Sequence, residues 1–133
     1  MVDKNSILKY LEENDIEEVE ELKVKEDLVV LRFFYDFDED EIKAAKAYAK
    51  DECSEEELSD EWYEEYYLPY LTDLAVDNIG ETVEGVCEEY NLDGQFASYD
   101  IEKENDDYCE CIAIFFDKGS NYELEELVEE LDL

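Results

Sequence analysis

The sequence predicts an α+β fold in which a mainly antiparallel sheet of about four strands packs with about five helices, in the order α-ββ-α-α-α-ββ-α. Two runs rich in branched and aromatic residues, 28–35 and 108–116, each follow a weaker strand across a polar turn and so indicate two hairpins. Three segments in which Asp or Ser precedes Glu by three residues indicate helix starts. The length of 133 residues suits a single acidic domain, residues 1–133.

The first elements are a short helix and a hairpin. Residues 5–13 have one apolar face and are expected to form a helix capped by Asn5 or Ser6. Residues 18–37 then change to the pattern of strands around a polar turn. The second strand of this hairpin, 28–35, is nearly continuous in apolar residues, so we expect it to be central and covered by helices on at least one face.

A helix is expected to follow the hairpin. Asp38 and Glu41 have the spacing of a capping box, in which each side chain satisfies a backbone N–H of the first helical turn. The apolar side of this helix is expected to be formed by Ile42, Ala45, Tyr48 and Ala49.

The longest helical stretch covers residues 55–90. It begins at a second capping pair, Ser54 with Glu57. Pro69 lacks a backbone N–H, and its ring clashes with the preceding turn. We therefore expect two helices here, or one bent helix, with the break near Leu68.

The chain is expected to end with a second hairpin and a helix. Residues 95–102 and 108–116 form the hairpin across a polar tip. Ser120 and Glu123 have the spacing of a third capping box. The terminal helix that they open is expected to be buried through Leu124, Leu127, Val128 and Leu131.

The charge of the chain is extreme. It has 44 Asp or Glu, 10 Lys or Arg and no His, for a formal net charge of −34. Binding to nucleic acid through phosphate contacts requires a basic surface, and so does docking to anionic membranes, so we exclude both. No apolar run approaches the length of a membrane-spanning helix and no export signal opens the chain, so we expect a cytoplasmic protein.

The sequence offers no clear metal or catalytic site. Cys53, Cys87, Cys109 and Cys111 are expected to be reduced, buried thiols, although a four-thiolate zinc site remains an alternative. Residues 36–40 resemble the start of a calcium-binding loop, but the required Gly and final Glu are missing. Without His the commonest general base is absent, and no glycine-rich phosphate loop occurs. We expect no cofactor and no enzymatic activity, with a carboxylate-based metal-dependent enzyme as a distant alternative.

Carboxylates recur at helical spacing in the middle of the chain. The first stripe follows steps of four, four, three and four, which places its members along one helix face over roughly 22 Å; it consists of Asp73, Asp77, Glu81, Glu84 and Glu88. The second stripe consists of Glu57, Glu61 and Glu65, with Asp60 and Glu64 alongside. No Lys or Arg occurs in the 52 residues from 51 to 102, whereas ordinary solvated helix faces alternate charges.

Aromatic side chains accompany the second stripe. Because they cover more than one side of a helix, we expect some of them to be exposed as interface anchors, although core packing is their commoner use. The candidate anchors are Trp62, Tyr63 and Tyr67.

These features favour a non-enzymatic acidic inhibitor that imitates a nucleic acid and occupies the basic groove of a DNA- or RNA-handling protein. In size and charge the chain is similar to phage anti-restriction and anti-CRISPR proteins, and a nuclease immunity protein would use the same surface. The alternative is a cytosolic accessory or interaction domain that is acidic for solubility or salt tolerance. Neither the identity of the partner nor the oligomeric state follows from the sequence.

Overall fold

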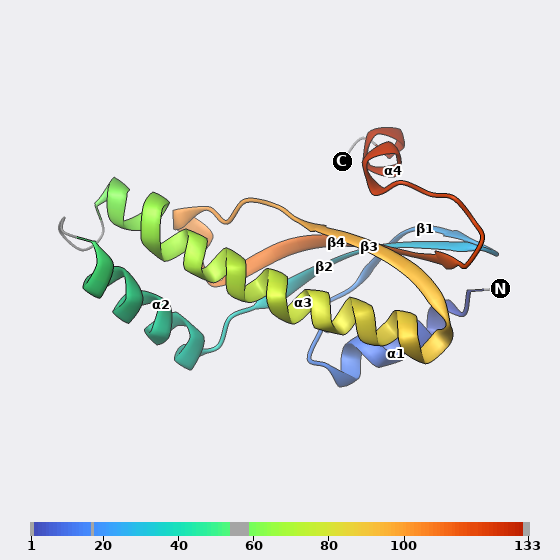
Figure 1. The fold of residues 1–133 in the computed structure, drawn as a ribbon, viewed down its shortest axis with the longest axis horizontal. Helices are drawn as coiled ribbons and strands as arrows, with labels where there is room; N and C mark the ends of the chain where they lie inside the picture. The colour runs from blue at the N-terminus through green and yellow to red at the C-terminus, as the bar shows by residue number, and fades with distance from the viewer. Residues whose placement is uncertain (1, 17, 54–58, 132–133) are drawn as a thin grey trace.

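A four-stranded antiparallel sheet in the order β1-β2-β4-β3 forms the centre of the computed structural model, which describes residues 2–16, 18–53 and 59–131 (Figure 1). The strands are β1 (Glu20–Lys25), β2 (Leu28–Asp36), β3 (Leu92–Ser98) and β4 (Tyr108–Asp117). β1 pairs with β2, β3 pairs with β4, and the two hairpins join where β2 pairs with β4 along its whole length. The predicted α+β class and antiparallel sheet are confirmed.

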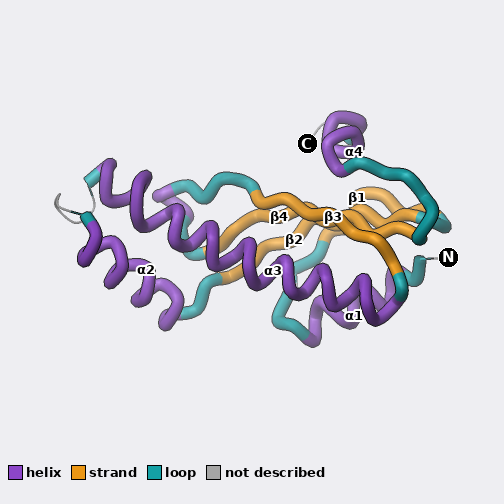
Figure 2. Tube along the Cα trace, viewed as in Figure 1, coloured by secondary structure: helices purple, strands orange, loops and turns teal. Residues whose placement is uncertain are grey.

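Helices lie on both sides of this sheet: α1 and α3 cover one face, with α2 packed against the long helix on the same side, and α4 covers the other face (Figure 2). The described residues contain four α-helices, one π-helical segment and one 3-10 turn; in chain order these are α1 (Lys4–Glu13), α2 (Glu39–Glu52), the π segment (Trp62–Tyr67), α3 (Leu68–Tyr90), the 3-10 turn (Lys103–Asn105) and α4 (Leu124–Glu130). The predicted count of about five helices and their order differ slightly from this, because residues 60–90 follow the alternative of one helix and not that of two.

The two inner strands are buried on both sides. Along β2, Val29, Leu31 and Phe33 point to the face with three helices, whereas Leu28 and Val30 point to α4. All five side chains have no exposed surface. The nearly continuous apolar run of this strand follows from its central place, as predicted.

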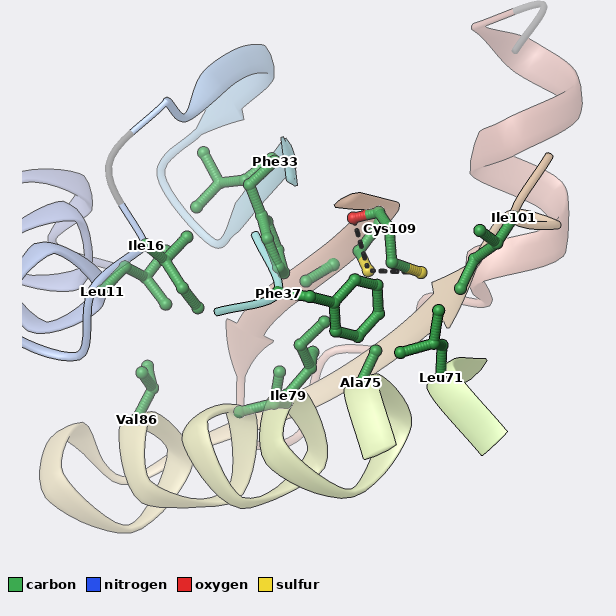
Figure 3. Close-up of a cluster of buried hydrophobic side chains, with 14 of the residues drawn as sticks. Leu11, Ile16, Phe33, Phe37, Leu71, Ala75, Ile79, Val86, Ile101 and Cys109 are labelled. Carbon is green, nitrogen blue, oxygen red and sulfur yellow. Dashed lines mark hydrogen bonds between the residues drawn. The ribbon is translucent and has the colours of Figure 1, made fainter. Parts of the chain in front are cut away.

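The larger core lies between the sheet and α3. Leu71, Ala75 and Ile79 of α3 converge with Phe33 of β2 and Cys109 of β4, and Leu11 of α1 closes one end of the same core (Figure 3). Each of these side chains is at most 1% exposed. This burial fixes which side of α3 faces the sheet and therefore which side faces solvent.

The predicted helix caps are confirmed in one case and wrong in two. Asp38 and Glu41 form the capping box of α2, with the Glu41 N–H donating to Asp38 Oδ1 over 2.8 Å. The cap of α1 is Asp3, which accepts the Ser6 N–H, and neither Asn5 nor Ser6. The predicted pair Ser54 and Glu57 lies outside the described residues.

The last helix is held by contacts that are distant in sequence. Ser120 and Glu123 form no capping box; the N–H of Leu124 instead donates to Gln95 Oε1 of β3 over 2.9 Å. Ser120 donates to Asp27, in the turn between β1 and β2. Leu124 and Leu127 are buried, whereas the other two side chains expected in this interface, Val128 and Leu131, are only partly buried.

The long helix is continuous through Pro69. Asp60 and Glu61 are already helical, and the backbone angles at the junction of the π segment and α3 are those of a right-handed helix. The Leu68 N–H donates to the Tyr63 carbonyl five residues earlier. This wider turn gives the carbonyls that precede Pro69 room for the proline ring, so the predicted break is absent.

A polar contact ties α2 and α3 to the sheet. The Tyr35 hydroxyl of β2 donates to Glu41 Oε2 over 2.7 Å and accepts from Asn78 Nδ2 over 2.7 Å. Burial, and then the hydrogen bond to Glu41, raise the pKa of Tyr35 to about 12. The ionised tyrosinate is therefore disfavoured in the folded state relative to the unfolded chain.

Replacing Tyr35 by Phe is expected to flatten the loss of stability at alkaline pH. Between pH 10 and about 12 the folded state retains a proton that the unfolded state has lost, so the free energy of unfolding falls as pH rises through this window. Tyr35→Phe removes this contribution, while at neutral pH it loses about 0.5–1.5 kcal/mol for each hydrogen bond. Urea denaturation of both proteins from pH 9 to 12 measures the two slopes, and equal slopes would contradict the assignment.

Candidate partner-binding surface

The exposed side of the long helix is almost entirely acidic. Of the ten exposed residues between positions 60 and 88, nine are Asp or Glu and the tenth is Pro69. We call these nine carboxylates the acidic ridge; they are Asp60, Glu61, Glu64, Glu65, Asp73, Asp77, Glu81, Glu84 and Glu88. Every carboxylate of the two predicted stripes belongs to the ridge except Glu57, which lies outside the described residues.

The π segment aligns the two parts of the ridge. Buried positions recur at 62, 67, 71, 75, 79, 83 and 86, so the step is five residues across the π segment and three or four elsewhere. At about 100° per residue, an uninterrupted α-helix would place Glu61 and Glu65 roughly 80–120° around the axis from Asp73. The additional residue in the π turn rotates both side chains by about 100° toward Asp73. Glu61 and Glu65 are therefore brought toward the line of the first stripe, whereas Asp60 and Glu64 lie to one side of it, roughly 80–120° around the axis from Asp73.

Within the described part of the chain, each ion pair includes a residue of β1 or β2. Arg32 lies 3.7 Å from Glu20 and 3.1 Å from Glu110, and Lys4 lies 3.3 Å from Glu21. Lys23 pairs with Glu130 of α4 and holds the pKa of that carboxyl below its usual value. None of these pairs includes a carboxylate between Asp73 and Glu88, so the negative potential along α3 is not balanced by them.

The predicted aromatic anchors are mostly core residues. Trp62 and Tyr67 are each 1% exposed and stack on one another, with ring centroids 4.6 Å apart. Tyr63 is partly buried against both of these rings. The five-residue step of the π turn is what brings Trp62 and Tyr67 to the same side of the helix. Neither Trp62 nor Tyr67 has surface available to a partner.

A groove beside the ridge is lined by three tyrosine side chains. It has a volume of about 370 Å³ and runs between α2 and the long helix, with Tyr48, Tyr66 and Tyr70 on its walls. The Tyr48 ring centroid lies 5.1 Å from that of Tyr70 and 6.5 Å from that of Tyr66. Three ridge carboxylates also line it, namely Glu65, Asp73 and Asp77. We call this feature the tyrosine groove.

The exposure of Tyr48 was not predicted from the sequence. Its helical spacing placed it on the buried side of α2, but the side chain is 42% exposed. Burial, and to a smaller extent the nearby carboxylate of Glu61, raise the pKa of the neighbouring Tyr66. The ionised form of this phenol is therefore disfavoured. The only signal in the sequence was the density of tyrosines, which does not tell which of them meet across two helices.

The four cysteines form no disulfide. Cys109 and Cys111 share one face of β4 with their sulfur atoms 3.9 Å apart, and Cys53 and Cys87 are partly buried. Among the described residues, no group of three or more His, Cys, Asp or Glu is placed to hold a metal ion. No described helix is both long enough and apolar enough to cross a membrane. Comparison with protein-family models, curated proteins and solved structures found no match to the chain.

Neutralising two ridge residues is expected to stabilise the protein. The double variant Asp77→Asn/Glu84→Gln removes all four neighbouring like-charge pairs among the five ridge carboxylates of α3, each of which costs about 0.2–0.5 kcal/mol. Because both side chains are exposed, no core contact is lost. The free energy of unfolding at low salt should rise by roughly 1–2 kcal/mol.

The matched control is Glu18→Gln/Glu26→Gln, which changes the net charge equally at two exposed positions outside the helices and strands. Urea denaturation at low salt compares both variants with the parent protein. An equal gain in both would assign the effect to net charge, and not to the ridge.

Proposed function

We propose that this protein is a non-enzymatic inhibitor that places its acidic ridge in the basic nucleic-acid groove of a cytoplasmic DNA- or RNA-handling protein. One observation carries the proposal: apart from Pro69, every exposed residue of the long helix between positions 60 and 88 is acidic. Such a surface favours cationic partners and accelerates their association through long-range attraction. It also repels nucleic acid itself.

The spacing of the charges supports imitation of a single phosphate strand. From Asp60 to Glu88 the ridge extends about 42 Å at 1.5 Å per residue, so it carries roughly one carboxylate per 5 Å. One DNA strand carries one phosphate per roughly 3.4 Å of axis and the duplex one per about 1.7 Å. The ridge approaches the density of one strand and falls well below that of a duplex. It therefore suits a partner groove that contacts one backbone at a time.

The segregation of charge argues against acidity that serves only solubility. Helix α2 carries charges of both signs, with lysines at positions 43, 46 and 50 between acidic residues at 39–41 and 51–52. The long helix beside it has no Lys or Arg at any position. Because acidic residues that serve only solubility need no such clustering, we favour a recognition surface.

Neutralising the α3 part of the ridge is expected to abolish binding to the partner and to leave the fold intact. The variant carries Asp73→Asn, Asp77→Asn, Glu81→Gln, Glu84→Gln and Glu88→Gln. The matched control removes five exposed carboxylates of α1 and α4, at Glu12, Glu13, Glu125, Glu126 and Glu129. Both lose the same charge, so only the location differs.

The measurement has two stages. Immobilised parent protein should capture a basic nucleic-acid-binding protein from lysate at low salt and release it at high salt. The purified captured protein should then release labelled nucleic acid when the parent protein or the control variant is added, but not when the ridge variant is added. Equal displacement by all three proteins, or capture of no basic protein, would overturn the proposal.

A further inference from the structure

The tyrosine groove has a composition that a simple acidic surface does not need. A carboxylate stripe attracts any cation at long range, whereas the groove brings the rings of Tyr48, Tyr66 and Tyr70 beside Asp73 and Asp77. Tyr48 is the second most exposed large hydrophobic side chain among the described residues, at 42%. An exposed aromatic ring at the edge of a carboxylate surface is a typical place for binding a cation.

We infer that this groove is an anchor site for an arginine side chain presented by the basic partner. The inference rests on the proposed function and adds the chemistry of its closest contact. The flat guanidinium stacks on the exposed ring of Tyr48, which Tyr70 supports from a centroid distance of 5.1 Å, and its N–H groups donate to Asp73 or Asp77. The ring faces supply the cation–π attraction, and the carboxylates accept charge-assisted hydrogen bonds.

Charge complementarity selects the occupant. No Lys or Arg is among the described residues that line the groove, whereas Glu65, Asp73 and Asp77 are. At 100° per residue, Lys46 and Lys50 of α2 lie roughly 160° around the helix axis from Tyr48, so they face away from the groove. A cation entering the groove therefore meets three carboxylates and no competing ammonium group.

Arginine fits this lining better than lysine does. The guanidinium is planar, weakly hydrated and able to stack on aromatic rings, and it can donate two parallel hydrogen bonds to one carboxylate. A lysine ammonium is strongly hydrated and makes only point contacts. Bidentate hydrogen bonds to a carboxylate favour arginine at any acidic surface, so only the part of the arginine preference that depends on Tyr48 reports stacking in the groove.

The test uses oligo-arginine and oligo-lysine peptides of equal length as probes, titrated into the full chain at low salt by calorimetry. The parent protein should bind the arginine peptide roughly three- to ten-fold more tightly than the lysine peptide. Tyr48→Leu should lower this preference by the part that ring stacking contributes, and Tyr48→Phe should retain it in full because the ring remains. Thermal unfolding of each variant establishes that it is folded.

Two further variants separate the groove from the ridge. Tyr90→Leu removes another exposed tyrosine, 37% exposed at the opposite end of α3, and should leave the preference unchanged. Glu81→Gln/Glu84→Gln/Glu88→Gln neutralises ridge carboxylates outside the groove and should weaken binding of both peptides by the same factor.

The possible results distinguish failure of the arginine site from failure of the whole acidic surface. Equal affinity of the parent protein for the two peptides, or a preference that is unchanged in Tyr48→Leu, overturns the arginine site and leaves the ridge in place. An equal reduction of the preference in Tyr90→Leu and in Tyr48→Leu also overturns the site, because the effect would not belong to the groove. Failure of both peptides to bind overturns the ridge and the groove together.

Discussion

The surface of this protein depends on the burial of one side of the long helix against the sheet. Leu71, Ile79, Val83 and Val86 are at most 5% exposed, and burying a side chain of this kind stabilises the fold by about 1.5–3 kcal/mol. A like-charge pair on the opposite side costs only about 0.2–0.5 kcal/mol. Burial outweighs the repulsion several-fold, so the fold tolerates carboxylates at every exposed turn of α3. The orientation of the ridge is thus a consequence of the core.

Local patterns predicted the sheet well because its determinants lie close together in sequence. The apolar run of β2 identified a central strand, and the spacing of Asp38 and Glu41 identified a real capping box. The cap of α4 was not predictable, since Gln95 belongs to a strand 29 residues earlier. The sequence left open whether the long helix ends or only bends near Pro69, because the rule for proline considers the backbone alone and not the core contacts on either side of it.

The carboxylates of the candidate surface were predictable from the sequence, whereas its aromatic side chains were not. Helical periodicity placed five carboxylates together, and all five are exposed on α3. The assignment of the aromatics failed because tyrosines at 63, 66, 67 and 70 cover several sides of a helix, and a one-residue change of register decides which are buried. That register is set by the stacking of Trp62 on Tyr67 inside the core. Tyr48 lies on a different helix, so only the tertiary packing of α2 brings it to the ridge.

The same packing makes the tyrosine groove a fixed feature. Tyr35 of β2 bonds to Glu41 of α2 and to Asn78 of α3, so the two helices that form the groove are held by one hydroxyl group of the sheet. Glu41 also caps the first turn of α2, which couples the start of that helix to the same contact. A groove whose walls are held before binding loses little conformational entropy when it is occupied. Long-range attraction by the ridge would accelerate the association of a basic partner, and the preformed groove would slow its dissociation. The two effects would act on the same partner because the ridge and the groove lie next to one another on the long helix.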